Sequence, residues 1–182
     1  MWVVIAIISL SNAFTATAKD NSTGIRMEIV ETEQDDNEFT LFTYKDEDGT
    51  TGYYLSLGRE LRISDLLDIK ILGGSLSHID EVCLFLGQTS DEALESMNSL
   101  LSLYDKDPDT LAEFPARLST GAEQLGESTT IICIVKKKFL GGKFLQFQFT
   151  SGKHTAETNL SKSSLKFLRK GLELHIKRHK NN

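Results

Sequence analysis

The sequence is poor in residues that disrupt or cross-link a chain: its 182 residues include two prolines, two cysteines and one tryptophan. Scarce proline and few low-complexity stretches argue against disorder over most of the length. With 40% hydrophobic and 25% charged residues, the composition is that of an ordinary globular protein. A chain of this length buries about 70% of the surface of its unfolded state. We therefore expect a single domain with a sizeable core.

Complete catalytic motifs are missing as well. Residues 73–77 end in serine where a nucleophile elbow requires glycine, and no Gly-x-x-x-x-Gly-Lys-Ser/Thr phosphate-binding loop is present. Ser163 and Lys166 match the Ser-x-x-Lys pattern of penicillin-binding enzymes, but the two companion motifs are absent. These absences favour a non-enzymatic protein, and no cofactor is predicted.

The histidines are the remaining candidates for catalysis or metal binding. His175 and His179 stand four residues apart and would share a helix face, but the glutamate of an HExxH zinc motif is missing between them. We therefore predict no metal site. His78 and Asp80 would share one face of a strand and could form an acid–base pair. Because catalytic groups need only meet in space, a small hydrolase assembled around His78, Asp80 or His154 is kept as an alternative.

The N-terminus lacks a basic start, since no lysine or arginine precedes Lys19. It does have an apolar run over residues 2–10 and small residues at Ala16 and Ala18. This pattern predicts a signal peptide at residues 1–18 and export to the periplasm, the cell surface or the medium. The alternative is an uncleaved apolar arm or a weak anchor. The run is too short to span a bilayer comfortably, so the mature chain is expected to have no stable transmembrane segment.

Cys83 and Cys133 each lie in a predicted strand. An exported chain tolerates a disulfide, so the two cysteines are candidates for one bridge. The alternative is a pair of buried free thiols, because cysteine packs as a small hydrophobic residue.

Charge is distributed unevenly along the chain. Residues 1–128 hold 8 Lys and Arg against 24 Asp and Glu, a net of −16, whereas residues 129–182 hold 12 against 2, a net of +10. A basic end can bind an anionic partner. We favour the other reading, in which the two parts attract each other within one fold.

Local patterns predict a hairpin over residues 38–57, a covered strand at 79–86, a helix at 89–105 and a final helix at 161–178. The helix at 89–105 should begin with a capping box formed by Thr89 and Glu92. A second helix start is expected at Asp107 and Pro108, ended by Pro115, with a loop over residues 118–128. The final helix should bury a seam of Leu165, Leu168, Leu172 and Ile176.

The turn of the first hairpin carries Asp46 and Asp48 ahead of Gly49 and resembles part of a calcium-binding loop. Tyr44 and Leu55 would then occupy two positions that need carboxylate ligands. A charged hairpin turn is therefore the preferred interpretation.

Residues 131–149 give the strongest strand signal, with two apolar runs separated by Gly141 and Gly142. A two-residue loop would mix apolar and polar side chains on both faces. An odd loop, such as 140–142 or 141–143, separates them and places a glycine in the left-handed region. The apolar face would then hold Cys133, Val135, Leu145, Phe147 and Phe149, and the exposed face would hold Lys136, Lys138, Gln146 and Gln148. Burying one clean apolar face favours the odd loop.

Together these patterns predict an α+β fold: a mainly antiparallel sheet of five to seven strands with two main helices packed on one face. The domain would span residues 38–182, after a polar linker or edge segment at 19–37. The leading functional prediction is an exported, non-enzymatic binding or scaffolding domain. The alternatives are the small hydrolase and an anion-binding module that uses the basic C-terminal part to hold an anionic surface or polymer. The candidate anion-binding residues are Lys136, Lys138, Lys166, Arg169 and Lys170.

Overall fold

The computed structural model describes residues 24–35, 37–58, 79–120, 124–151 and 154–180. The predicted signal peptide at 1–18 and His78 lie outside these ranges. Within them, no helix is both long enough and apolar enough to cross a membrane.

Eight strands and two helices make up the described part of the chain. In order they are β1 (Ile25–Gln34), β2 (Asn37–Lys45), β3 (Thr51–Ser56), β4 (Ile79–Gly87), α1 (Ser90–Leu103), β5 (Leu111–Thr120), β6 (Gln124–Lys137), β7 (Lys143–Ser151), β8 (His154–Ser161) and α2 (Lys162–Lys180). Each strand pairs antiparallel with the next one, so the spatial order of the sheet is the order of the sequence.

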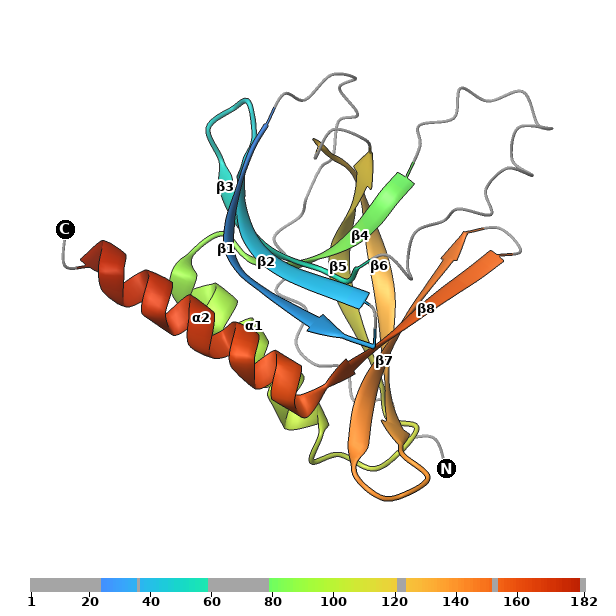
Figure 1. The fold of residues 1–182 in the computed structure, drawn as a ribbon. Helices are drawn as coiled ribbons and strands as arrows, with labels where there is room; N and C mark the ends of the chain where they lie inside the picture. Colours follow the sequence, from blue (N-terminus) through green and yellow to red (C-terminus); the bar gives the residue numbers. More distant parts are fainter. Residues whose placement is uncertain (1–23, 36, 59–78, 121–123, 152–153, 181–182) are drawn as a thin grey trace, which may run out of the picture.

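The sheet curls until its first and last strands meet at one corner (Figure 1). Gln34 donates from Nε2 to the carbonyl of Asn159 over 3.0 Å. Its Oε1 accepts from the backbone N–H of Ser161 over 2.8 Å. Beside it, Asn37 donates from Nδ2 to Oγ1 of Thr158 over 2.7 Å. These side-chain contacts join the two ends of the meander and give it the shape of a half-barrel.

The expected sheet of five to seven strands with two helices packed on its face is therefore wrong. The sheet has eight strands and is strongly curled. Helix α2 lies against the edge strand β1 and against α1, and α1 contacts β4. Strand β1 agrees with the edge-segment alternative for residues 19–37, a segment that reads as polar because none of the β1 side chains is fully buried at the sheet edge.

Strand β5 was missed, because it occupies residues expected as a short helix and a loop. Its ladder with β4 ends at the pair Leu84 and Ala116, and Pro115 follows one residue beyond that pair. There β5 has β6 as its only partner strand, with Pro115 opposite Thr130. A strand tolerates proline where one side is unpaired, because no ladder donor is lost on that side. Pro115 therefore lies within strand β5, although the sequence suggests that it ends a helix.

The sheet buries side chains on both faces. The face that meets the helices carries the larger core, which includes Leu41, Leu55, Leu84 and Phe147. The opposite face carries a smaller, mainly aromatic cluster of Phe42, Tyr44, Tyr54, Cys83 and Leu125, with Phe85 packed against it. Alternation along the strands explains the division, since neighbouring residues such as Leu41 and Phe42 point to opposite faces.

Both helices follow their sequence signals. Thr89 caps α1 by accepting a bond from the N–H of Glu92 over 3.2 Å, and the Glu92 carboxylate accepts from the N–H of Thr89 over 3.2 Å. The predicted capping box is therefore confirmed. In α2 the predicted seam is buried as expected: Leu165, Leu168, Leu172 and Ile176.

Gly171 lies in the middle of α2 because the helix approaches β1 there too closely for a side chain. A Cβ placed on Gly171 would lie 2.5 Å from Cγ1, 2.7 Å from Cβ and 2.9 Å from Cγ2 of Val30. Alanine would gain about 1 kcal/mol of helix propensity but cost about 1–3 kcal/mol through overpacking. We expect Gly171→Ala to lower the free energy of unfolding by about 1 kcal/mol, as measured by urea denaturation.

The matched control is Gly171→Ala combined with Val30→Ala. Replacing Val30 removes two of the three contacting atoms, so the loss caused by Gly171→Ala should shrink in that background. A Gly171→Ala protein as stable as the wild type would show that helix and strand do not meet this closely.

Candidate anion-binding surface at the β6–β7 turn

The β6–β7 hairpin ends in a five-residue turn between the paired residues Lys137 and Lys143. The N–H of Lys138 donates to the carbonyl of Gly142 over 3.0 Å, and the N–H of Gly141 donates to the carbonyl of Lys138 over 3.1 Å. Gly141 has φ +92° and Gly142 has φ +81°, conformations that other residues rarely adopt. We call residues 136–143 the hairpin tip.

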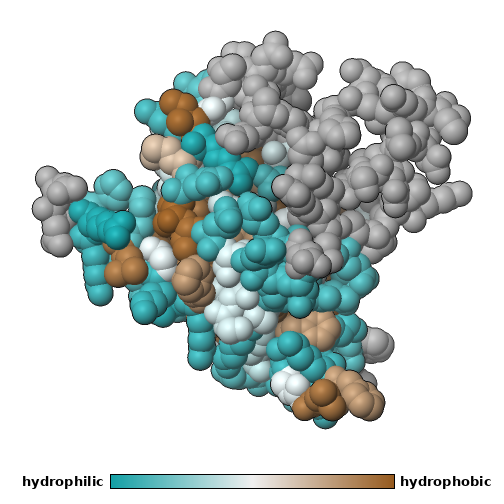
Figure 2. All heavy atoms as spheres, viewed as in Figure 1, coloured by the Kyte–Doolittle hydropathy of each residue, from teal (hydrophilic) through white to brown (hydrophobic). Residues whose placement is uncertain are grey.

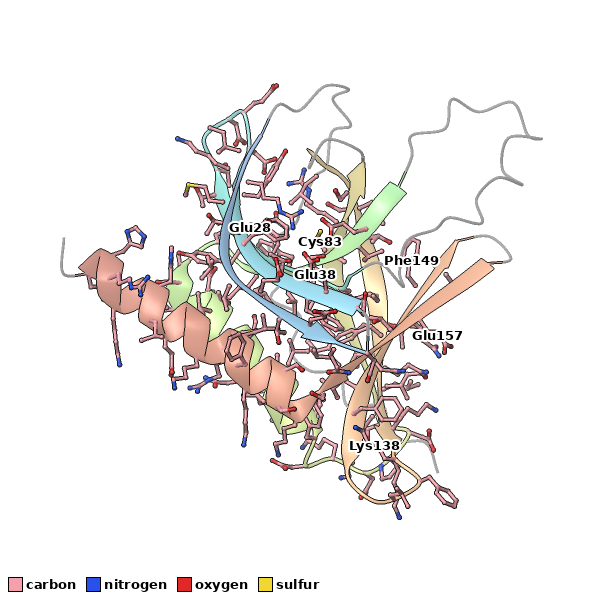
Figure 3. All side chains as sticks on the ribbon, in the orientation of Figure 1. Glu28, Glu38, Cys83, Lys138, Phe149 and Glu157 are labelled. Atoms are coloured by element: carbon pink, nitrogen blue, oxygen red, sulfur yellow. The ribbon has the colours of Figure 1, made fainter. Side chains whose placement is uncertain are left out.

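The odd number of turn residues confirms the predicted division of side chains between the two faces, although the strand pairing differs from that of either loop considered from the sequence. Cys133 pairs with Phe147 and Val135 with Leu145, and all four side chains are fully buried. Lys136 lies on the opposite face with Gln146 and Gln148, which both donate to the exposed carboxylate of Glu157. The turn is longer than either of the two examples considered from the sequence. Lys138 consequently lies in the turn and not on the strand face (Figure 3).

Two large apolar side chains at the end of the hairpin tip are exposed to solvent. Phe139 is 101% exposed and Leu140 is 94% exposed, higher fractions than those of the other exposed hydrophobic residues in the described ranges. Figure 2 shows apolar atoms at the lower end of the molecule, where Figure 1 places this turn. Neither side chain belongs to the hydrophobic core.

Four lysines surround these apolar residues: Lys136, Lys137, Lys138 and Lys143. Lys136 forms an ion pair with Asp109 over 2.8 Å, and the ammonium group of Lys143 donates to the carbonyl of Lys106. In the described part of the chain, Lys137 and Lys138 form no ion pair. Among the described residues, the hairpin tip therefore presents two lysines, Lys137 and Lys138, whose charge is not paired with a carboxylate.

The other predicted anion-binding residues lie along α2 and are not gathered at the hairpin tip. Lys166 and Lys170 are exposed. Arg169 is occupied, because it donates from Nε to Asn98 over 2.7 Å and pairs with Glu173 over 3.1 Å. Figure 1 shows the hairpin tip projecting beyond the end of the molecule at which α2 begins.

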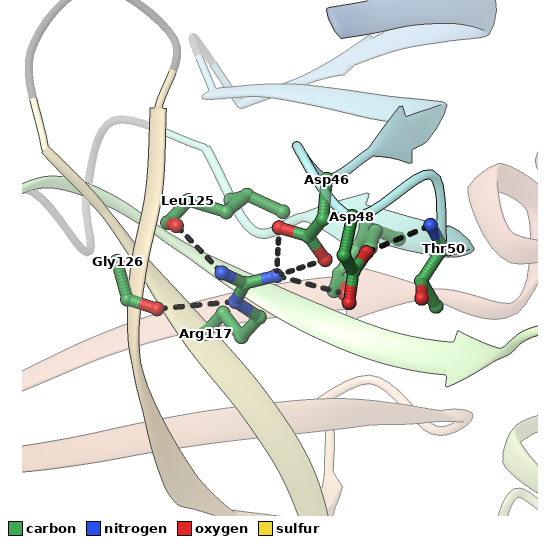
Figure 4. Close-up of polar contacts among 7 residues, drawn as sticks. Asp46, Asp48, Thr50, Arg117, Leu125 and Gly126 are labelled. Atoms are coloured by element: carbon green, nitrogen blue, oxygen red, sulfur yellow. Dashed lines mark hydrogen bonds and ion pairs between the residues drawn. The ribbon is translucent and has the colours of Figure 1, made fainter. Parts of the chain in front are cut away.

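Sequence reasoning missed a partly buried arginine, Arg117, on the face of the sheet opposite the helices (Figure 4). Arg117 donates from Nη2 to the carbonyl of Leu125 over 2.7 Å and from Nε to that of Gly126 over 3.1 Å. Its Nη1 lies 3.0 Å from Oδ2 of Asp46. Burial, the largest single influence, lowers the pKa of Arg117, but the contacts with Tyr54 and Asp46 outweigh it and leave the pKa raised. This cation holds β5, β6 and the turn after β2 together.

A second arginine occupies the same face. Arg26 pairs with Glu81, whose other carboxylate oxygen accepts from the hydroxyl of Ser56. The Arg26 guanidinium lies 4.0 Å from the centre of the Phe42 ring, a cation–π arrangement. Its Nε is buried without a hydrogen-bond partner among the described residues. No sequence motif marks either arginine, since their partners are far away in the chain.

The acidic turn after β2 is a structural turn in this arrangement. Asp46 binds Arg117, and Asp48 accepts from the N–H of Thr50 over 2.8 Å. The bonds from Thr50 lower the pKa of Asp48 below its ordinary value. Within the described ranges, no group of three or more His, Cys, Asp or Glu side chains could hold a metal ion.

Cys83 and Cys133 are free and buried, and the structure does not join them in a disulfide. They lie in different hydrophobic clusters, Cys83 on the face with Arg117 and Cys133 on the face that meets the helices. Burial raises the pKa of both thiols well above the ordinary value, and the charge of Glu81 adds to the effect at Cys83. Both are therefore neutral thiols at physiological pH and not activated nucleophiles.

The side chains considered for a hydrolase lie outside the described structure, so that alternative stays a prediction. His78 lies outside the described residues. Asp80 belongs to β4 and His154 to β8, but their side chains are also outside the described part.

Comparison with models of protein families gives no match, and neither curated proteins nor solved structures match the chain significantly.

Proposed function

We propose that this chain is an exported, non-enzymatic binding domain that holds an anionic surface or polymer through the hairpin tip. The observation that supports this most strongly is the pair Lys137 and Lys138, which lies on a projecting turn without a carboxylate partner in the described structure. Residues 128–156 contain no aspartate or glutamate, so positive charge is not interrupted along this part of the sequence.

The acidic charge of the rest of the chain should orient the domain as it approaches an anionic partner. The whole chain carries a formal net charge of −6. An anionic partner would be repelled by the acidic part and attracted to the tip, which orients the domain during approach. Such attraction between exposed charges is screened within about 10 Å at 0.1 M salt, so binding should weaken as salt is added.

Ion pairs between the described residues do not neutralise the charges of Lys137 and Lys138. Among the described residues, two ion pairs join the basic C-terminal part to the acidic part, Lys136 with Asp109 and Lys162 with Asp105. Both aspartates are largely exposed, and such pairs contribute at most about 1 kcal/mol each. Mutual attraction of the two parts, the interpretation favoured from the sequence, therefore leaves Lys137 and Lys138 available for a partner.

The test is retention on immobilised heparin, used as a model polyanion. The wild-type chain should be retained at low salt and released as salt rises. Lys137→Glu with Lys138→Glu should abolish retention, since the two substitutions reverse the unpaired charge of the tip.

The control is Lys177→Glu with Arg178→Glu at the exposed end of α2, which changes the net charge by the same amount. This variant should be retained like the wild type. If both variants lose retention equally, only overall charge matters. No retention of the wild type at low salt would disprove the proposal.

A further inference from the structure

We infer that the anionic partner is a lipid bilayer surface, which Phe139 and Leu140 enter while the lysines of the hairpin tip contact the headgroups. The inference rests on the proposed function and names the class of partner. A dissolved polyanion offers charge but little apolar volume, so it would leave both side chains in water. A bilayer satisfies the apolar and the basic residues together.

The two apolar residues of the turn stand side by side at the end of the hairpin. Scattered exposed hydrophobic residues are normal on a protein surface. Phe139 and Leu140 are adjacent, are 101% and 94% exposed, and occupy the projecting end of a hairpin. Their side chains can therefore enter an apolar phase without any rearrangement of the core.

The backbone of the turn is partly hydrogen-bonded within itself. Unpaired N–H and C=O groups are costly in hydrocarbon. In the turn, the N–H groups of Lys138 and Gly141 already donate to the carbonyls of Gly142 and Lys138. Gly141 and Gly142 adopt the positive φ angles that this compact turn requires, so the tip is shaped before it meets a partner.

The lysines of the hairpin tip lie beside the apolar turn, at the level where lipid headgroups would contact them. Lys137 and Lys143 face each other at the end of the ladder, and Lys138 opens the turn. Lysine side chains can lie along apolar surface and keep the ammonium group at the interface. Each lysine close to an anionic membrane improves affinity by about fivefold. Anionic phospholipid therefore fits this tip better than zwitterionic lipid does.

The experiment is flotation of the full chain with vesicles of phosphatidylcholine alone and of phosphatidylcholine mixed with phosphatidylglycerol. The wild type should float with the mixed vesicles and much less with phosphatidylcholine alone. Phe139→Ser with Leu140→Ser should reduce partitioning at least about tenfold, since it removes both apolar side chains. The same variant should keep its retention on heparin, because its lysines are unchanged.

The matched control is Ile25→Ser with Met27→Ser. These residues of β1 are 62% and 61% exposed and lie far from the hairpin tip. This variant should float like the wild type. The serine variant of the tip should also keep the wild-type melting temperature, because neither residue packs in the core.

The outcomes separate this inference from the proposed function. Retention on heparin without flotation on mixed vesicles would overturn the bilayer inference and leave the proposed function standing. Failure of both assays would overturn both. A tip variant without Phe139 and Leu140 that floats like the wild type would also contradict the insertion of these side chains.

Discussion

Replacing Arg117 with methionine is expected to lower the free energy of unfolding by about 3 kcal/mol. The side chain of Arg117 is 15% exposed, and its guanidinium satisfies the carbonyls of Leu125 and Gly126 as well as the carboxylate of Asp46. Methionine has similar length but supplies no donor, so the two carbonyls lose their hydrogen bonds from the guanidinium. Asp46 is 26% exposed and can recover some hydration, which places the loss at the lower end for a buried ion pair. Urea denaturation measures the effect.

Lys162→Met is the control for Arg117→Met. Lys162 also pairs with an aspartate, Asp105, but the two side chains are 42% and 77% exposed. Its loss should cost less than about 1 kcal/mol. Equal destabilisation by the two substitutions would contradict the structural role assigned to the Arg117 contacts.

Asn37→Ala is expected to destabilise the fold by about 2–3 kcal/mol. Asn37 is 2% exposed, and its Nδ2 donates to the carbonyl of Leu57 over 3.1 Å and to Oγ1 of Thr158 over 2.7 Å. These bonds tie the start of β2 to the segment after β3 and to β8. Alanine would leave a carbonyl and a hydroxyl unsatisfied at the corner where the sheet closes on itself. The measurement is again urea denaturation.

A double-mutant cycle shows whether the bond across the corner matters. Thr158→Val removes only the acceptor on β8, and the combined variant should lose less than the sum of the two single losses, by at least about 0.5 kcal/mol. Strictly additive losses would mean that Asn37 and Thr158 do not interact, and the curl of the sheet would then need another explanation.

Side-chain alternation made the two faces of the β6–β7 hairpin predictable, but not the length of its turn. Only an odd loop places Cys133, Val135 and Phe147 on one face, and burial of that face is the dominant energy term. The helix starting after Thr89 was equally predictable, because its capping box is formed by neighbours in the sequence. Both signals depend on residues close together in the chain.

The full length of β1 and the existence of β5 were not predictable from local pattern. β1 is an edge strand whose exposed side chains resemble a linker. β5 contains Pro115, which usually ends a regular element but here lies beyond the β4 ladder. In both cases strand pairing decided the structure, and pairing involves residues far apart in sequence.

The candidate site was predictable only in part. Its basic character is evident from Lys136 and Lys138, but Lys166, Arg169 and Lys170 of α2 are not gathered at the tip. Phe139 and Leu140 read as the end of an apolar run, and such runs are normally buried. Their exposure depends on the turn length, because a five-residue turn carries both residues past the end of the ladder.

The central claim is that the hairpin tip enters an anionic membrane surface, and a fluorescent reporter at its apex tests this most directly. Trp2 is the single tryptophan and lies in the predicted signal peptide, so Phe139→Trp leaves one indole, at the tip, once Trp2 is replaced by phenylalanine or residues 1–18 are removed. The claim predicts that its emission shifts to shorter wavelength with mixed phosphatidylcholine–phosphatidylglycerol vesicles and that added salt reverses the shift. An emission maximum that stays at its value in water when these vesicles are added would contradict the claim.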